Sequence, residues 1–226
     1  MNLADLRWPD LSADAHRTVL AVPLGATEQH GPHLPLDTDT AIATELCRRL
    51  AARIPNIIVA PAIPYGSSGE HTGFPGTLSI GAAALEFLVV ELVRSADAFA
   101  GTVLVNGHGG NLQPLRAAVA TLHAEGRRVL LWCPRGTPGD SHAGHAETSA
   151  MLRIRAHEVT MSAAAPGNTR PLPDLIDDLR RHGVAFVSPN GVLGDPTHAD
   201  PAAGEHLLTD WAQALAAATT RWLNHR

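Results

Sequence analysis

The chain alternates short apolar runs with longer amphipathic segments. Apolar runs that stop in turn-forming residues are typical of strands buried on both faces of a sheet, and such runs occur at 18–24, 57–60, 102–105 and 128–133. Apolar residues recur at helical spacing in the segments 38–54, 82–99, 113–125, 148–154 and 202–224. This alternation predicts right-handed crossovers and an α/β fold in three layers, α/β/α, around a mostly parallel central sheet.

The helix predicted at 38–54 has recognisable ends. Thr38 or Asp39 is expected to cap its N-terminus, and Pro55 follows its last turn. The pattern places Arg49 on the face opposite the apolar stripe, so we expect this side chain to face water.

Two regions do not follow the alternation. The segment 61–80 is a long loop rich in glycine, and loops of that length in compact domains usually carry function. The segment 156–200 is broken by proline and glycine, with one short helix expected at 172–181 and a turn at 191–196.

Composition narrows the class of protein. With 226 residues and 45% apolar content, the chain suits a single domain over 1–226. A net charge of −5 and the absence of a dense basic cluster make nucleic acid an unexpected partner. No apolar run reaches the length of a membrane span, so we expect a cytoplasmic protein. Cys47 and Cys133 are far apart and are expected to be reduced thiols in the core.

The stretch 25–39, GATEQHGPHLPLDTD, concentrates ionisable side chains in a loop. It carries Glu28, His30, His33, Asp37 and Asp39 among two prolines and two glycines. Such side chains must be solvated, paired or bound to a ligand. Together with thirteen histidines in the chain, this composition points to metal binding or acid–base chemistry.

Candidate ligands follow each predicted strand in turn. In open α/β sheets, ligands bind at the carboxyl edge, where the ends of parallel strands meet. Four loops placing histidines and carboxylates on one edge therefore predict a common site. In chain order, the residues are Glu28, His30 and Asp39, then Glu70 and His71, then His108, then His142 and Glu147.

Each motif alone has a second interpretation. Glu28 and His30 are compatible with a surface ion pair, and the NGHGGN segment at 106–111 with an anion-binding turn. Glu70 and His71 are compatible with a lid or a subunit contact. A noncatalytic anion-binding module is therefore the alternative from outside the enzymes.

Four motifs in order, GATEQHGPHLPLDTD, GEHTGFPGT, NGHGGN and HAGHAETS, resemble the creatininase family of metal-dependent amidohydrolases over about residues 18–200. The resemblance implies a creatininase-like fold, a homo-oligomer arranged as a hexamer-like ring, and two divalent ions per subunit. It implies Glu28, Asp39 and His108 on one ion and His30, Asp39 and Glu147 on the other, with Asp39 bridging. Such mixed ligands suit Zn, Fe(II) or Mn.

The resemblance also implies a reaction. A water held between the two ions would ionise near neutral pH and attack an amide carbonyl. His142 would carry the proton to the leaving amine. The loop 107–111 would stabilise the oxyanion through backbone amides. Candidates for substrate binding are Glu70, His71, Gly109 and Gly110.

Two departures bear on the substrate. Creatinine-hydrolysing relatives carry a Glu two residues after the histidine of the third motif, where this chain has Gly110, so that Glu147 must supply the carboxylate. They also close their small cyclic substrate with tryptophans, whereas this chain has none between Trp132 and Trp211. Creatinine amidohydrolase activity is therefore disfavoured. The chain is more similar to the branch that trims a C-terminal Val-Tyr dipeptide from a modified precursor peptide, with hydrolysis of formamides or other small amides as the alternative.

Overall fold

A four-stranded parallel sheet forms the middle layer of the computed structural model, which describes residues 1–11, 15–136 and 138–225. Its order is β2-β1-β3-β4, with β1 pairing to β2 from Val19 and to β3 along its whole length. The strands are β1 (Val19–Leu24), β2 (Ile57–Val59), β3 (Gly101–Asn106) and β4 (Val129–Trp132). The predicted parallel sheet is confirmed.

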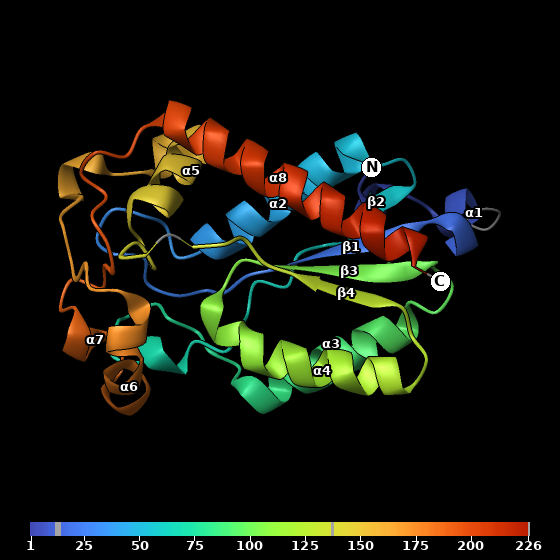
Figure 1. Ribbon diagram of the computed structural model, residues 1–226, viewed down its shortest axis with the longest axis horizontal. Coiled ribbons are helices and arrows are strands. Elements are labelled where there is room, and N and C mark those ends of the chain that lie inside the picture. The colour runs from blue at the N-terminus through green and yellow to red at the C-terminus, as the bar shows by residue number, and fades with distance from the viewer. Residues whose placement is uncertain (12–14, 137, 226) are drawn as a thin grey trace.

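Helices cover both faces of this sheet (Figure 1). One face carries α2 (Thr38–Arg53), α5 (His145–Arg155) and α8 (Pro201–Asn224), and the other carries α3 (Ala82–Ser95) and α4 (Leu112–Ala124). The short helices are α1 (Trp8–Leu11), α6 (Leu172–His182) and α7 (Val184–Val187). The last two lie at the end of the molecule away from both termini (Figure 1). This arrangement confirms the three-layer α/β/α fold.

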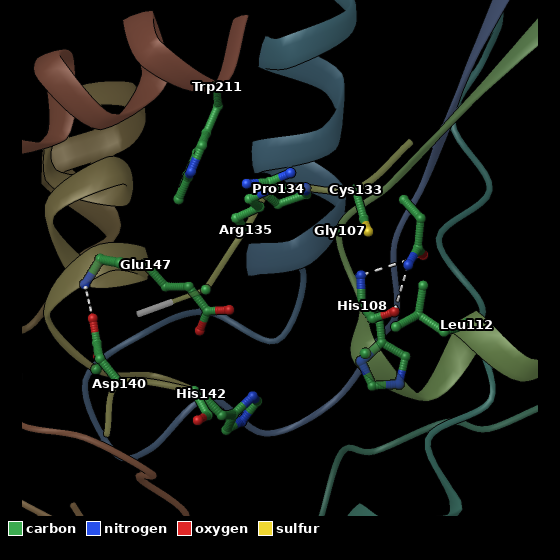
Figure 2. Close-up of a pocket in the computed structure, with 16 residues that line it drawn as sticks. Gly107, His108, Leu112, Cys133, Pro134, Arg135, Asp140, His142, Glu147 and Trp211 are labelled. Carbon is green, nitrogen blue, oxygen red and sulfur yellow. Dashed lines mark hydrogen bonds between the residues drawn. The ribbon is translucent and has the colours of Figure 1, made fainter. Parts of the chain in front are cut away.

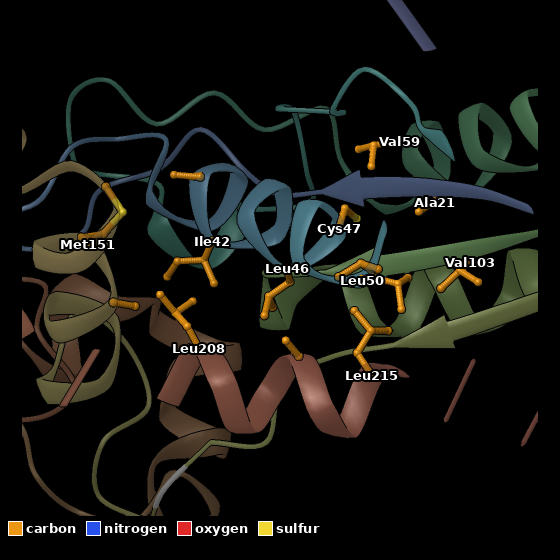
Figure 3. Close-up of a cluster of buried hydrophobic side chains, with 14 of the residues drawn as sticks. Ala21, Ile42, Leu46, Cys47, Leu50, Val59, Val103, Met151, Leu208 and Leu215 are labelled. Carbon is orange, nitrogen blue, oxygen red and sulfur yellow. The ribbon is translucent and has the colours of Figure 1, made fainter. Parts of the chain in front are cut away.

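The strand β1 shows why both layers of helices are needed. Side chains alternate in direction along a strand, so Val19 and Ala21 enter one core while Leu20, Val22 and Leu24 enter the other. All six residues of β1 are buried. Figure 3 shows the first core, in which side chains of α2 and α8 meet those of the sheet.

The helix α2 corrects two expectations. Asp37 is its N-cap residue, although its side chain makes no capping hydrogen bond, and Asp39 lies inside the first turn. Arg49 is buried rather than exposed, because its guanidinium bonds the carboxylates of Glu45 and Glu205 at 2.7 Å each. A pattern read along one helix could not include Glu205, which comes from α8.

Among the described residues, none of the helices combines the length and apolarity that a membrane span requires.

Replacing Leu50 by Ala should destabilise the fold strongly. Leu50 is fully buried in the core between α2 and the sheet, so the truncation leaves a cavity and should cost about 2–5 kcal/mol. Urea unfolding followed by circular dichroism measures this cost. The control is Leu88→Ala on α3, whose side chain is 37% exposed and should cost less than about 1 kcal/mol. Equal losses in the two variants would contradict the core assignment.

Candidate metal centre

Five side chains that the sequence singles out meet at the carboxyl edge of the sheet. The ligand atoms of two three-residue groups lie within 4.8 Å of one another inside each group. Both groups contain Asp39, which the first turn of α2 presents to the cluster. The groups are Glu28, Asp39 and His108, and His30, Asp39 and Glu147, while a third group of the same kind, without Asp39, joins Glu28, His30 and His142. The structure therefore brings together both of the sets implied by the family resemblance.

The loop after β3 is built to hold His108. Asn106 donates its side-chain amide to the backbone carbonyl of His108 at 2.7 Å, and Asn111 donates to the Asn106 side chain at 3.1 Å. Gly107 allows this loop to lie against the start of α2, since a Cβ there would sit 2.5 Å from the backbone oxygen of Asp39. Glycine and asparagine in this motif thus fix one ligand beside another.

Both histidines of the two groups use one ring nitrogen for the backbone and turn the other to the carboxylates. His30 Nδ1 lies 3.1 Å from the backbone oxygen of Glu28, while its Nε2 lies 3.1 Å from Asp39 Oδ1. His108 Nε2 lies 3.1 Å from the Ser67 carbonyl, and its Nδ1 lies 3.1 Å from Glu28 Oε1. Histidines that bind metals are oriented in this way, by donating the remote N–H to a carbonyl.

Three carboxylate oxygens of the cluster are buried without a hydrogen-bond partner among the described residues: both oxygens of Glu28 and Oδ2 of Asp39. Buried carboxylates of this kind are costly unless an ion or a donor satisfies them. Imidazole and carboxylate together suit divalent transition metals. The residues present therefore fit a divalent metal site.

In the metal-free chain, charge pairing dominates at the ligand histidines. Burial disfavours the charged imidazole of His30, but the carboxylates of Asp39, Glu147 and Glu28 outweigh it and raise its pKa to about 10. His142 shows the opposite balance, because burial and the neighbouring imidazoles of His30 and His71 hold its pKa well below the usual range. A neutral imidazole thus lies beside the cluster.

Gln29 fixes the tautomers of two histidines, a role that no motif or periodicity indicated. The backbone oxygen of Gln29 accepts from His142 Nε2 at 2.8 Å, which leaves His142 Nδ1 unprotonated and 3.8 Å from Glu28 Oε1. The Gln29 side-chain amide donates to His71 Nδ1 at 2.9 Å and to the Gly191 carbonyl at 3.1 Å. His71 must then carry its proton on Nε2, which faces Glu28 Oε1 at 3.3 Å.

One cavity, of about 920 Å³, opens from the cluster toward α4 and α6. Its lining includes the four predicted substrate-binding residues, Glu70, His71, Gly109 and Gly110. His71 is buried, with Nε2 3.3 Å from Glu28 Oε1, which places it beside the cluster. Gly110 has no room for a side chain, since a Cβ would lie 2.3 Å from the Ser67 carbonyl.

A second cavity lies on another side of the cluster, between His108, His142 and Glu147 (Figure 2). Cys133 lines it and is half-buried, which corrects its assignment to the core. Trp211 lines it too, reaching the site from α8. Trp211 therefore supplies an indole to the site, although no tryptophan lies between Trp132 and Trp211 in the sequence.

The fold and this cluster together define a metal-dependent amidohydrolase, an enzyme that acts on C–N bonds. A family model described as Creatininase, creatinine amidohydrolase, matches residues 4–219. The chain belongs to the creatininase family.

Relatives and solved structures agree with this family. The chain is 49% identical over 213 residues to the mycofactocin precursor peptide peptidase of Mycobacterium ulcerans (strain Agy99), covering 90% of this chain and 85% of that protein. A crystal structure of creatinine amidohydrolase (creatininase) superposes with a TM-score of 0.80 at 27% identity, covering 97% of this chain and 96% of that one. A structure described as "Creatininase Mn" has a TM-score of 0.78 at 28% identity and covers 96% of both chains.

Replacing Asp39 by Asn should remove most of the bound metal. Asp39 belongs to both three-residue groups, and the amide removes the negative charge that both positions share. We expect about two equivalents of transition metal per wild-type chain and less than about half of one in the variant, measured by elemental analysis after gel filtration. His157→Asn, at an exposed histidine far from the cluster, should keep the wild-type content. Full occupancy in Asp39→Asn would contradict the site.

Proposed function

We propose that this protein is a dinuclear-metal peptidase that removes the C-terminal Val-Tyr dipeptide from the modified mycofactocin precursor peptide. The observation that carries the metal chemistry is the pair of three-residue groups sharing Asp39. The observation that supports the substrate is the 49% identity to a mycofactocin precursor peptide peptidase over 90% of this chain.

Two divalent ions would be held by the two groups, with Zn, Fe(II) and Mn as the candidates. Glu28, Asp39 and His108 would hold one ion, and His30, Asp39 and Glu147 the other. Bound there, such ions lower the pKa of a water molecule to near neutrality and polarise an amide carbonyl. Three carboxylates balance most of the charge of two divalent cations.

His142 is the proposed proton carrier. Its Nε2 is committed to the Gln29 backbone oxygen, so Nδ1 is the free basic atom and faces the cluster. His142 takes the proton from the attacking water at Nδ1 and returns it to the leaving amine. The low pKa of this ring keeps it neutral at the start of the cycle. Gly109 and Gly110 line the same cavity, where their backbone amides would stabilise the oxyanion.

The shape of the site favours a peptide over a small amide. Cavities open from the cluster in two directions, and both are lined in part by His108 and His142. An extended peptide needs room on both sides of the scissile bond, whereas formamide or creatinine fills only one. The homo-oligomer, as a hexamer-like ring, and the cytoplasmic location remain predictions.

Metal-loaded protein incubated with modified and unmodified precursor peptide tests the function directly. We expect mass spectrometry to show loss of the C-terminal dipeptide from the modified peptide. Release of formate or ammonia from a panel of small amides, with both peptides intact, would instead support the small-amide hydrolase. Neither activity, in a chain that holds less than about half an equivalent of metal, would support the anion-binding module.

Replacing His142 by Asn should lower kcat about 10²–10⁴-fold, because the leaving amine loses its proton donor. Metal content should stay at the wild-type level, since His142 is absent from both proposed ligand sets. Turnover of the precursor peptide and elemental analysis on the same samples check both statements, with His157→Asn as the control. A variant with full metal and full turnover would place the proton carrier elsewhere.

A further inference from the structure

We propose that Arg116 and Arg180 form a subsite that binds a carboxylate of the peptide substrate in the cavity beside the metal cluster. This inference rests on the proposed peptidase function and names the chemistry by which that function selects its substrate.

The cavity between the cluster, α4 and α6 carries a local excess of positive charge. Apart from His71, His108 and His142 at the cluster, four basic side chains line it, whereas Glu70 is its one acidic lining residue among those that the structure describes. The whole chain has the opposite balance, with 22 acidic residues against 17 arginines. A basic wall in an acidic protein favours an anionic ligand at this place. The four are Arg116, Arg180, Arg181 and His182.

Two of these arginines are free to bind. Arg181 is engaged, since its guanidinium bonds the Asp177 carbonyl at 3.1 Å and the Asp178 carboxylate at 3.4 Å. Arg116 and Arg180 have no hydrogen bond or ion pair from their side chains to any described residue, and both are exposed. Glu70 lies 3.6 Å from His108 Nε2 and is directed to the cluster.

The fold brings these two guanidinium groups to one cavity from separate helices. Arg116 lies one turn after Leu112, the first residue of α4, which follows the loop that holds His108. Arg180 lies in the last turn of α6, whose residues Leu175 and Leu179 are packed in a small core. Helices anchored in this way place both arginines at the lining of this cavity.

A carboxylate fits this pair better than other polar groups. Guanidinium presents its donors as a planar fork that matches the two oxygens of a carboxylate, and hydrogen bonds of this charge-assisted kind are about twice as strong as neutral ones. A peptide offers carboxylates from two sources, acidic side chains near the scissile bond and the C-terminus itself. The proposed subsite binds a carboxylate, and the experiment below distinguishes an acidic side chain from the C-terminus as its source.

Four variants of the modified precursor peptide, each ending in Val-Tyr, test the subsite with metal-loaded protein. They combine Glu or Gln at the positions before the scissile bond with a free or an amidated C-terminus. For the wild type, kcat/KM should be about 10–100-fold higher for the peptides that carry the carboxylate recognised by the subsite than for those that lack it. The difference should lie in KM rather than in kcat. The R116Q/R180Q double variant should lose this preference. Raising the salt concentration should reduce the preference in the wild type.

R221Q is the matched control, because Arg221 on α8 is also exposed but lines neither of the two cavities at the cluster. It should keep the wild-type preference. A wild-type enzyme that cleaves all four peptides equally, a preference that survives in R116Q/R180Q, or a preference lost in R221Q would each overturn the subsite.

Equilibrium binding separates failure of the subsite from failure of the peptidase function. The same four peptides, N-methylated at the scissile amide, are titrated against metal-loaded wild-type and R116Q/R180Q protein. Tighter binding of a carboxylate peptide to the wild type alone supports the subsite even if no unmethylated peptide is cleaved, a result that would reject the peptidase. Equal binding of all peptides rejects the subsite, while cleavage would still support the peptidase.

Discussion

The structure depends on the burial of carboxylate oxygens that the described residues leave without hydrogen-bond partners. Glu28 is fully buried and Asp39 nearly so, yet both of the Glu28 oxygens and Oδ2 of Asp39 accept no hydrogen bond from the described residues. Such an arrangement is stable only with a cation or a proton between the oxygens and the facing imidazoles. The parallel sheet makes it possible, because its strands end at one edge and deliver side chains from separate loops to a single point.

The layers of the fold and the proposed ligands were predictable from local patterns. The strand β1 is an apolar run buried on both faces. Such a run can be recognised from the local sequence, without knowing which residues pack against it. The proposed ligands follow strand ends in short motifs, so that Glu28, His30 and His108 could be named as candidates once the strands were placed. Asp39 was named for the same reason, although its position inside the first turn of α2 was not foreseen. The family resemblance then distinguished the ligands from the other candidates at the same edge.

The remaining features depend on contacts between residues far apart in the chain. Gln29 lies between two predicted ligands, but its function comes from the Gly191 carbonyl, 162 residues away. In the sequence pattern of its helix, Arg49 occupies a position expected to be exposed. In the structure it pairs with Glu205 on α8 and is buried. Trp211 on α8 lines the second cavity, and in the sequence it comes directly after the interval without tryptophan that begins at Trp132. No periodicity or motif contains such pairings, because each is set by the packing of complete helices.

The loop 25–39 links metal binding to proton transfer through adjacent residues. Glu28 and His30 point into the cluster, while Gln29 between them directs its backbone oxygen to His142 and its side chain to His71. One short stretch therefore serves both the proposed ligands and the proposed proton carrier. Moving this stretch would therefore shift a ligand and the basic nitrogen of His142 together, which keeps the attacking water and its proton acceptor in register.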